Sequence, residues 1–132
     1  MIRQSLTNAR HVVETDKILC CILPEDVFYS YNKPGTLCTV EDLQLIFEQY
    51  EIHAENGPLK IIAEMGEHSQ MDKKSREYLQ NHKIDAICEA AIIHNLAQRI
   101  LINFYHKLKS HSHPSKVFKS FDNSLKWVHS MN

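Results

Sequence analysis

One stretch of the chain, "AIIHNLAQRILINFYHKL" at residues 91–108, constrains the fold most, because the spacing of its apolar residues changes part-way along. Residues 87–93 are small or β-branched, which is typical of a buried strand. After Asn95 the apolar residues recur at helical spacing. Asparagine is among the preferred helix N-caps, and Gln98 stands where it can complete a capping box. The stretch therefore predicts a strand, a cap and an amphipathic helix over 96–108.

The predicted helix has an apolar side that needs a partner. Its members are Leu96, Ala97, Ile100, Leu101, Phe104, Tyr105 and Leu108. The opposite side is polar, whereas a membrane span needs about 20 consecutive apolar residues and does not tolerate such an arc. The pattern predicts a helix that packs its apolar side against a core, with no membrane span. Ile102 is the one apolar residue on the polar side. It is either an ordinary exposed isoleucine, which we favour, or part of an interface.

The rest of the chain alternates strands and helices. Two runs of strand-forming residues flank "PED", which predicts a hairpin of 17–23 with 27–31. The other predicted strands are 59–65, 87–93 and 115–121, and the other predicted helices are 40–54, one from Ser69 or Asp72 to about residue 81, and one capped by Asp122. This order predicts an α/β fold. We expect a mixed, mostly parallel sheet of about five strands, with the hairpin antiparallel, and about four helices.

Length and composition narrow the class of protein. The chain has 132 residues, so we expect a single domain over 1–132, with residues 1–10 poorly ordered or peripheral. The net charge is −1 and basic residues do not cluster, which argues against nucleic acid as a partner. The first residues lack the apolar run of a signal peptide, which favours a cytoplasmic protein. Four cysteines without metal-binding spacing are expected to be reduced and buried.

Three segments carry a resemblance to a known family: "IIAEMGEHSQMDKKSREYL", "AAIIHNLAQRILINFYHKL" and "PSKVFKSFDNSLKWV". With the element order, they resemble the small bacterial STAS-like (SpoIIAA-like) proteins, which are related to anti-sigma-factor antagonists and loosely grouped with lipid-binding domains. The likeness is greatest to a stand-alone subgroup, common in Bacteroidetes, whose role is not established. It covers about residues 11–131 and is carried by Ile102, Asn103, Phe104, Tyr105, Pro114, Phe118, Leu125, Trp127 and Val128. Most of these are core positions, so the resemblance implies a fold and no reaction.

The resemblance also raises the question of a phosphorylated serine. In anti-sigma-factor antagonists this serine starts the helix after the central strand, within an Asp-Ser-Ser-Gly-like turn. This chain has "DKKSR" at 72–76, so Ser75 is out of register and the glycine is replaced by Arg76. If a phosphoswitch operates, Ser75 or Ser69 is the candidate, because a phosphate at a helix N-terminus meets free backbone N–H groups. The departure from the motif favours serines that only cap or line the helix.

Polar residues follow two predicted parallel strands, His68 and Ser69 after one and His94 and Asn95 after the next. Ligands of open α/β sheets bind beyond the carboxyl ends of the strands, so these four residues are the candidate site for a ligand or partner. Ser69 with His68 or His94 could be written as nucleophile and base. Because the glycines of a nucleophile elbow and an oxyanion donor are missing, we assign no catalytic residue and expect no enzyme.

Nine histidines make a metal site worth testing. His106, His111 and His113 could bring three imidazoles together for zinc or nickel, but no carboxylate or cysteine accompanies them at ligand spacing. The three glycines are isolated, so no phosphate-binding loop is present. We therefore expect neither a metal nor another cofactor. Glu64 and Glu89 lie in predicted strands and receive no role, because strand alternation lets either face solvent.

These observations favour a non-enzymatic regulatory or protein-interaction module of the STAS-like type, which binds a protein partner. A homodimer formed through Ile102 or a sheet edge is a further expectation. The alternative is a carrier or sensor of a small, lipid-like apolar ligand. Its groove would lie beside the helix at 95–108, between that helix and the last one, with Trp127 in its lining.

Overall fold

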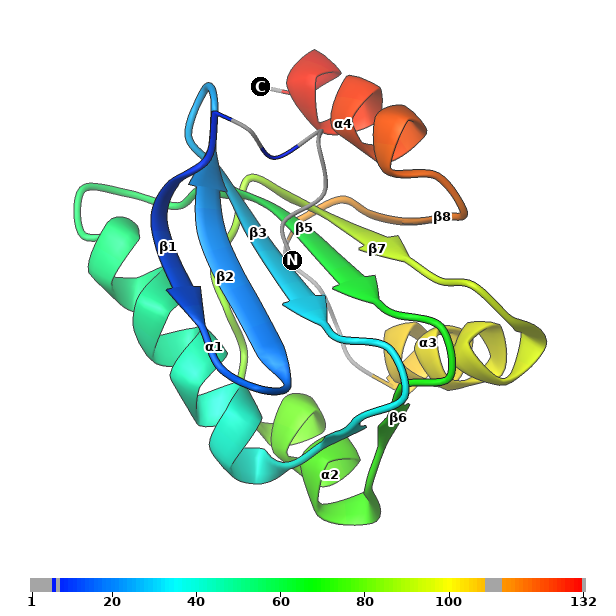
Figure 1. Ribbon diagram of the computed structural model, residues 1–132. Coiled ribbons are helices and arrows are strands. Elements are labelled where there is room, and N and C mark those ends of the chain that lie inside the picture. The colour runs from blue at the N-terminus through cyan, green and yellow to red at the C-terminus, as the bar shows by residue number, and fades with distance from the viewer. Residues whose placement is uncertain (1–5, 7, 109–112, 132) are drawn as a thin grey trace.

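The computed structural model describes residue 6, residues 8–108 and residues 113–131, with the side chains of 104–108 left out. The main sheet has six strands in the order β1-β2-β3-β5-β7-β8 (Figure 1). These are β1 (Arg10–Glu14), β2 (Ile18–Leu23), β3 (Val27–Asn32), β5 (Lys60–Met65), β7 (Cys88–Ile92) and β8 (Ser115–Phe118). A small parallel pair is formed by β4 (Leu37–Cys38) and β6 (Gln70–Met71). The helices are α1 (Val40–His53), α2 (Lys73–Asn81), α3 (Leu96–Leu108) and α4 (Phe121–Ser130).

The sheet is mixed, as the sequence predicts. The β1-β2 and β2-β3 pairs are antiparallel, and β3, β5, β7 and β8 run parallel to one another. The additional member is β1, an edge strand whose residues are mostly exposed and whose pairing is interrupted by a bulge. Exposed edge residues show no apolar alternation, and this is why the sequence pattern missed β1.

The amino-terminal segment is less peripheral than expected. Leu6 is buried in the core, where it packs with residues of β2 and β3. The expectation that 1–10 is poorly ordered or peripheral is therefore wrong for Leu6, whereas Arg10 is exposed on the edge strand β1. Residues 1–5 and 7 lie outside the described part of the chain.

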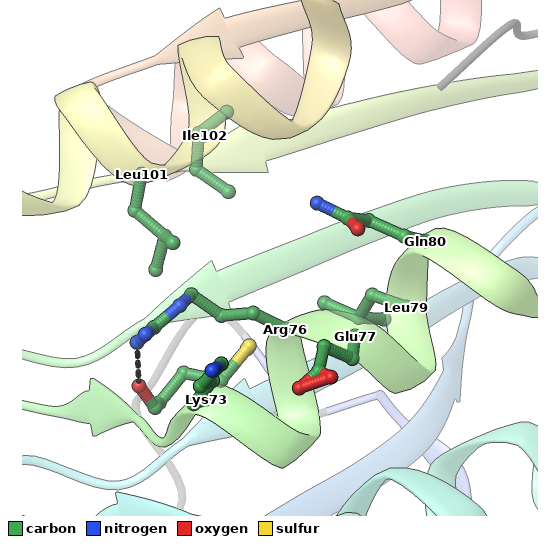
Figure 2. A pocket seen from close by; sticks show the side chains of 8 residues that line it. Lys73, Arg76, Glu77, Leu79, Gln80, Leu101 and Ile102 are labelled. Carbon is green, nitrogen blue, oxygen red and sulfur yellow. Dashed lines mark hydrogen bonds between the residues drawn. The ribbon is translucent and has the colours of Figure 1, made fainter. Parts of the chain in front are cut away.

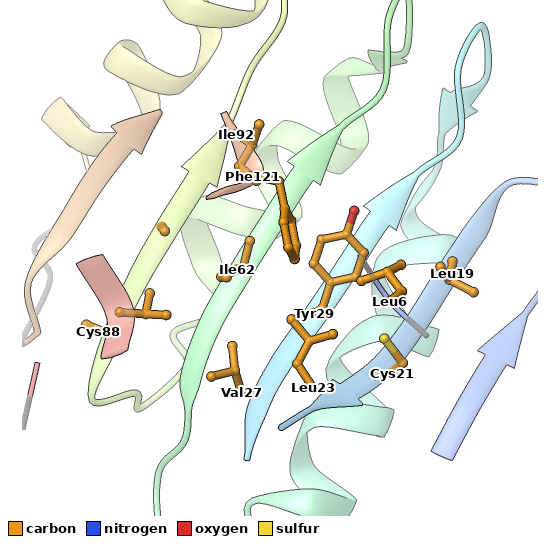
Figure 3. Close-up of a cluster of buried hydrophobic side chains, with 12 residues drawn as sticks. Leu6, Leu19, Cys21, Leu23, Val27, Tyr29, Ile62, Cys88, Ile92 and Phe121 are labelled. Atoms are coloured by element: carbon orange, nitrogen blue, oxygen red, sulfur yellow. The ribbon is translucent and has the colours of Figure 1, made fainter. Parts of the chain in front are cut away.

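Each face of the main sheet has its own apolar cluster. One face packs against α4, with Tyr29, Ile62, Ile92, Phe121 and Val128 among the buried residues (Figure 3). The other face packs against α1 and α2, with Phe28, Ile61, Leu43, Ile46 and Tyr50 among the buried residues. Right-handed crossovers between successive parallel strands place the intervening helices on the same face of a sheet.

The four cysteines are free and buried, as expected. Cys20 and Cys21 are neighbours on β2 and belong to the clusters on opposite faces of the sheet. Burial raises the pKa of Cys20 to about 12 and that of Cys21 to about 11. These thiols are therefore protonated at neutral pH and pack as small apolar groups.

The start of α1 follows the predicted capping pattern. Thr39 precedes the helix, and its backbone N–H donates to Asp42 Oδ2 at 2.8 Å. The same carboxylate oxygen lies 2.7 Å from Nζ of Lys17, the residue before β2. Burial raises the pKa of Asp42, but the bonds from Lys17 and Thr39 outweigh it and leave that pKa below its ordinary value. The cap therefore also ties α1 to the sheet.

The start of α3 is as predicted, whereas its orientation is not. Asn95 is the N-cap, and its Oδ1 accepts from Gln98 N at 2.9 Å. Leu96 and Ile100, expected against the core, are 71% and 61% exposed, while Gln98 is only 3% exposed. Ala97 is also exposed, and Ile102, expected on the polar side, is half-buried. The prediction of which side of α3 packs inward is therefore wrong for these residues.

The last helix begins slightly earlier than predicted. Its N-cap is Ser120, whose Oγ accepts from Asn123 N at 3.2 Å, so Asp122 lies within the first turn instead of capping the helix. Ser120 and Asp122 both match the residue types preferred at N-caps, and sequence alone does not choose between them.

Within the described residues, no helix has the length and apolar character that crossing a membrane requires.

Candidate functional site

The side chain of Gln98 joins the carboxyl ends of β5 and β7. Its Nε2 donates to Gly66 O at 2.9 Å and to Ser69 O at 3.2 Å, and lies 3.5 Å from Ser69 Oγ. Its Oε1 accepts from His94 N at 2.8 Å. Both the donor and the acceptor of this amide are satisfied, so its burial at the start of α3 is stable. These bonds hold the inner side of α3 against the 66–69 turn and explain its orientation.

The 66–69 turn also depends on a close backbone approach. A Cβ on Gly66 would lie 2.6 Å from Asn32 O, which is closer than real Cβ atoms come. Glycine has no Cβ and avoids this clash, so the N–H of Gly66 can donate to Asn32 O at 2.8 Å. His68 follows with a φ of 60° and is exposed. The turn therefore packs Ser69 inward and leaves His68 in solvent.

A buried carboxylate lies next to this turn. Glu64 on β5 is 2% exposed, and Tyr29 OH donates to its Oε1 at 2.6 Å. His94 Nε2 lies 2.9 Å from Glu64 Oε2, and the His94 side chain is 28% exposed. The three side chains link the core on the α4 face to the surface at the end of β7. A carboxylate that accepts from two such partners is satisfied despite its burial.

The sequence alone assigned Glu64 no role. The signal was present, because Glu64 alternates with Ile62 on the strand and therefore shares the α4 face with it. Identifying the partners required the fold, because Tyr29 lies 35 residues away along the chain and His94 lies 30 residues away.

Three of the four predicted site residues come together. Ser69, His94 and Asn95 all hydrogen-bond to Gln98. His68 lies outside this network. Ser69 is 3% exposed beneath Gln98, and the described residues contain no Ser–His hydrogen bond. The arrangement is therefore an attachment point for α3 and does not resemble a nucleophile with its base.

Both serines that the resemblance suggested for phosphorylation are buried. Ser75 is 0% exposed, and its Oγ donates to Cys38 O at 3.0 Å. Its N–H donates to Asp72 Oδ1 at 2.8 Å, which makes Asp72 the N-cap of α2. A kinase could reach neither hydroxyl without local opening of the fold. Phosphorylation of Ser75 or Ser69 stays an untested prediction that this burial disfavours.

The candidate metal ligands are placed only in part. His113 Nε2 lies 3.2 Å from Glu89 Oε1, and the His113 side chain is 6% exposed. His111 and the side chain of His106 lie outside the described residues. In the portion of the chain that is described, no group of three metal-binding side chains occurs.

A groove of about 230 Å³ runs between α2 and α3 (Figure 2). Its lining is mainly apolar near α3, with Leu101 and Ile102, and carries charged side chains on α2. Arg76 is among these charged residues, and its Nη1 donates to Met71 O at 2.8 Å. The inward turn of Ile102, which sequence analysis placed on the polar side, forms one wall of this groove.

A cavity of about 110 Å³ lies deeper, between the sheet and the helices, and shares Met71, Leu79 and Ile102 with the groove. Its sheet wall includes Phe28, Ser30, Asn32, Ile61, Ala63, Glu89 and Ala91. Leu43, Ile46 and Phe47 of α1 complete it. The Oδ1 atom of Asn32 is buried and has no hydrogen-bond partner among the described residues.

The groove therefore lies where the sequence did not place it. We expected it between α3 and the last helix, with Trp127 in its lining. Trp127 instead packs against Phe118, with ring centroids 5.7 Å apart, in the cluster on the α4 face. The groove and cavity lie on the opposite face, where α2 supplies the second wall.

The fold and the arrangement of its helices define a SpoIIAA-like α/β protein. The chain is similar to the crystal structure of an uncharacterised protein from the DUF3478 family with a SpoIIAA-like fold, from Shewanella loihica PV-4. The TM-score is 0.59 at 17% identity, over 88% of this chain and 97% of that one. The chain belongs to the DUF7793 family, a domain of unknown function, whose model matches residues 21–132. No curated protein matches the chain significantly.

These comparisons confirm the SpoIIAA-like fold that the sequence motifs implied. They assign no activity, because similarity at this level of identity extends to the fold alone.

Proposed function

We propose that this protein is a non-enzymatic regulatory module that binds a protein partner through the exposed apolar side of α3. The observation that carries the proposal is the exposure of Leu96 and Ile100, at 71% and 61%. The two side chains are four residues apart and lie on the same side of the helix. Covering a side chain of this size contributes about 1.5–3 kcal/mol, so the pair could supply much of the affinity for a partner.

Charge favours one kind of partner. The sequence of α3 contains no acidic residue and includes Arg99 and Lys107. Arg99 also lines a hollow of about 330 Å³ at the start of the helix, together with His94 and Lys119. We therefore propose a partner segment that presents apolar residues flanked by carboxylates. A second copy docked through the same face would bring basic residues together, so a homodimer through α3 is disfavoured.

A synthetic peptide provides the test. The probe is an amphipathic helical peptide of leucine and glutamate, and the comparison is the same peptide with lysine in place of glutamate. By isothermal titration calorimetry, we expect the glutamate peptide to bind and the lysine peptide not to bind. Equal binding of both peptides, or binding of neither, would contradict the proposal.

Matched variants locate the surface. Leu96→Gln combined with Ile100→Gln should weaken binding of the glutamate peptide at least about tenfold, because the apolar contact is lost. Leu37→Gln combined with Ile52→Gln is the control, since both residues are large, apolar and exposed elsewhere, at 45% and 55%. Retained affinity in the α3 variant, or the same loss in the control, would place the interaction outside α3.

A second candidate function is the transport or sensing of a small apolar ligand. The cavity and the groove support it, because they share lining residues and are mainly apolar. Native mass spectrometry of gently purified protein tests this candidate. A retained small molecule supports it, and a clean mass of the chain alone argues against it.

A further inference from the structure

We infer that the cavity between the sheet, α1, α2 and α3 takes a small neutral ligand that donates a hydrogen bond to Asn32 and extends an apolar body towards the α2–α3 groove. This inference rests on the second candidate function, and it names the chemistry of the ligand. A primary alcohol is the simplest member of this class.

The unpaired oxygen of Asn32 supplies the main evidence. Its Oδ1 is buried without a hydrogen-bond partner in the described part of the chain, and Asn32 lines the cavity. Nearly all buried polar atoms in native proteins are paired, so we take this unpaired oxygen beside the cavity as an acceptor with a missing partner. A carbonyl oxygen only accepts hydrogen bonds, so the missing partner must be a donor.

The position of Asn32 on β3 gives the cavity a polar end. Strand alternation puts Phe28, Ser30 and Asn32 on the same face, and all three line the cavity. Phe28 lies at one end of this row and contacts apolar residues of α1, including Tyr50 at 5.4 Å between ring centroids. The lining therefore changes along β3 from an aromatic ring to a hydroxyl and an amide. A ligand with a polar head and an apolar body matches this change.

A carboxylate in the wall selects against anionic ligands. Glu89 lines the cavity from β7, in register beside Ile61 of β5. Its carboxylate is 3.2 Å from His113 Nε2 at the outer edge of the sheet. Burying a second carboxylate close to it would cost both desolvation and like-charge repulsion. The cavity should therefore accept a hydroxyl more readily than an ionised fatty acid.

The space suits a small molecule with a chain. The cavity measures about 110 Å³ and the groove about 230 Å³. Met71, Leu79 and Ile102 line both spaces. Rotation of the flexible Met71 side chain would join the two spaces. The joined volume reaches the lower end of the range for small-molecule sites, about 300 Å³ and above.

Three probes with similar apolar chains and different polar groups test the inference on the full-length protein: 1-octanol, methyl heptyl ether and octanoate. Thermal unfolding is followed at increasing concentrations of each. We expect a saturable rise of Tm with 1-octanol, and an apparent affinity at least about tenfold lower for the ether, which lacks a donor, and for octanoate, which is charged.

Two variants locate the effect. Asn32→Leu should abolish the preference for the alcohol over the ether, whereas Asn56→Leu, at an exposed loop position, should leave it unchanged. Ala63→Leu should remove the response to 1-octanol, because Ala63 lines the cavity and a larger side chain would occupy it. A response that survives Ala63→Leu would place the alcohol elsewhere and overturn the inference.

The outcomes separate this inference from the function on which it rests. If the ether binds as well as the alcohol, or octanoate binds better, the carrier proposal stands and the donor inference fails. If none of the probes changes Tm saturably, the cavity holds water only, and both the carrier proposal and the inference fail. These wild-type measurements decide the question even if Asn32→Leu does not fold.

Discussion

The two faces of the main sheet are packed to different degrees. On the α4 face, Val27, Tyr29, Ile62, Ile92 and Val128 are fully buried and form a continuous apolar cluster (Figure 3). On the other face, α1 and α2 cover the sheet and a cavity lies beneath them. A groove runs beside it between α2 and α3 (Figure 2). The first is a closed face, and the second is called the open face here because it borders a cavity.

The difference arises from how the helices are held. α4 buries Phe121, Ser124 and Val128 directly on the sheet. α3 is held at its start by the amide of Gln98, and the apolar side chains of Leu96 and Ile100 point to solvent. Apolar packing is non-directional and fills space, whereas a hydrogen-bonded amide fixes a direction and leaves space beside it. A polar attachment can therefore keep a cavity open.

The largest contrast is expected between Ile62 and Ile102. Ile62→Ala on the closed face should lower the free energy of unfolding by about 3 kcal/mol, because it leaves a void in a tightly packed cluster. Ile102→Ala in the groove should cost about 1 kcal/mol or less, since this side chain is half-buried. Urea denaturation measures both. Equal losses would mean that the two faces are packed alike.

The next effect concerns the buried carboxylate on the closed face. Glu64→Ala should lower the free energy of unfolding by about 2 kcal/mol, because Tyr29 OH loses its acceptor at 2.6 Å in the core. Glu67→Ala, at an exposed position three residues on, is the control and should change it by less than about 0.5 kcal/mol. A loss at Glu64 no greater than in the control would show that the core does not depend on this hydrogen bond.

A smaller effect is expected where α3 is attached. Gln98→Ala should cost about 1–2 kcal/mol, because Gly66 O, Ser69 O and His94 N lose their partner. Amide hydrogen exchange should accelerate in α3 and the 66–69 turn while α4 stays protected. Gln44→Ala, at an exposed position of α1, is the matched control. Unchanged exchange in α3 would mean that apolar contacts hold this helix without Gln98.

The smallest effect depends on pH and concerns α1 on the open face. Lys17 and Thr39 lower the pKa of Asp42 against the opposing effect of burial. A carboxyl group with a lowered pKa in the folded state stabilises the fold above its ordinary value of 3.8, and this stabilisation disappears as the pH falls through the folded-state pKa. Asp42→Asn should therefore cost about 1 kcal/mol at neutral pH.

The pH profile checks the sign of this prediction. The Tm values of wild type and Asp42→Asn should converge as the pH falls below the lowered pKa of Asp42. Below that pKa the wild-type carboxyl is protonated and uncharged, like the amide of the variant. A difference that stays constant from neutral to acidic pH would indicate loss of the cap geometry and no contribution from charge.

Much of the fold could be predicted from local signals. The change of apolar spacing at Asn95, the Thr39 cap and the short β-rich runs gave the order of strands and helices and the mixed sheet. Each of these signals depends on neighbours within a few residues. β1 was missed because an exposed, bulged edge strand shows no alternation.

The candidate site could be predicted only in outline. His68, Ser69, His94 and Asn95 were named as the candidate site for a ligand or partner. Ser69, His94 and Asn95 hydrogen-bond to Gln98, and His68 does not belong to this network. The sequence did not predict that Gln98 joins these residues. It also did not predict the contacts of Glu64 with Tyr29 and His94. These partners come from distant segments, and a pairing of that kind leaves no spacing pattern in the sequence.

The sequence by itself determined the class of fold, the caps of α1 and α3 and the burial of the cysteines. Backbone conformation near a cap and the alternation of a strand are set by residues close together in the chain. Only the tertiary structure decided which side of α3 faces inward, and with it the exposure of Leu96 and Ile100 and the opening beside Ile102. The physical reason is that a helix can bury a polar side chain when the rest of the fold supplies its hydrogen bonds, and for Gln98 the 66–69 turn supplies them.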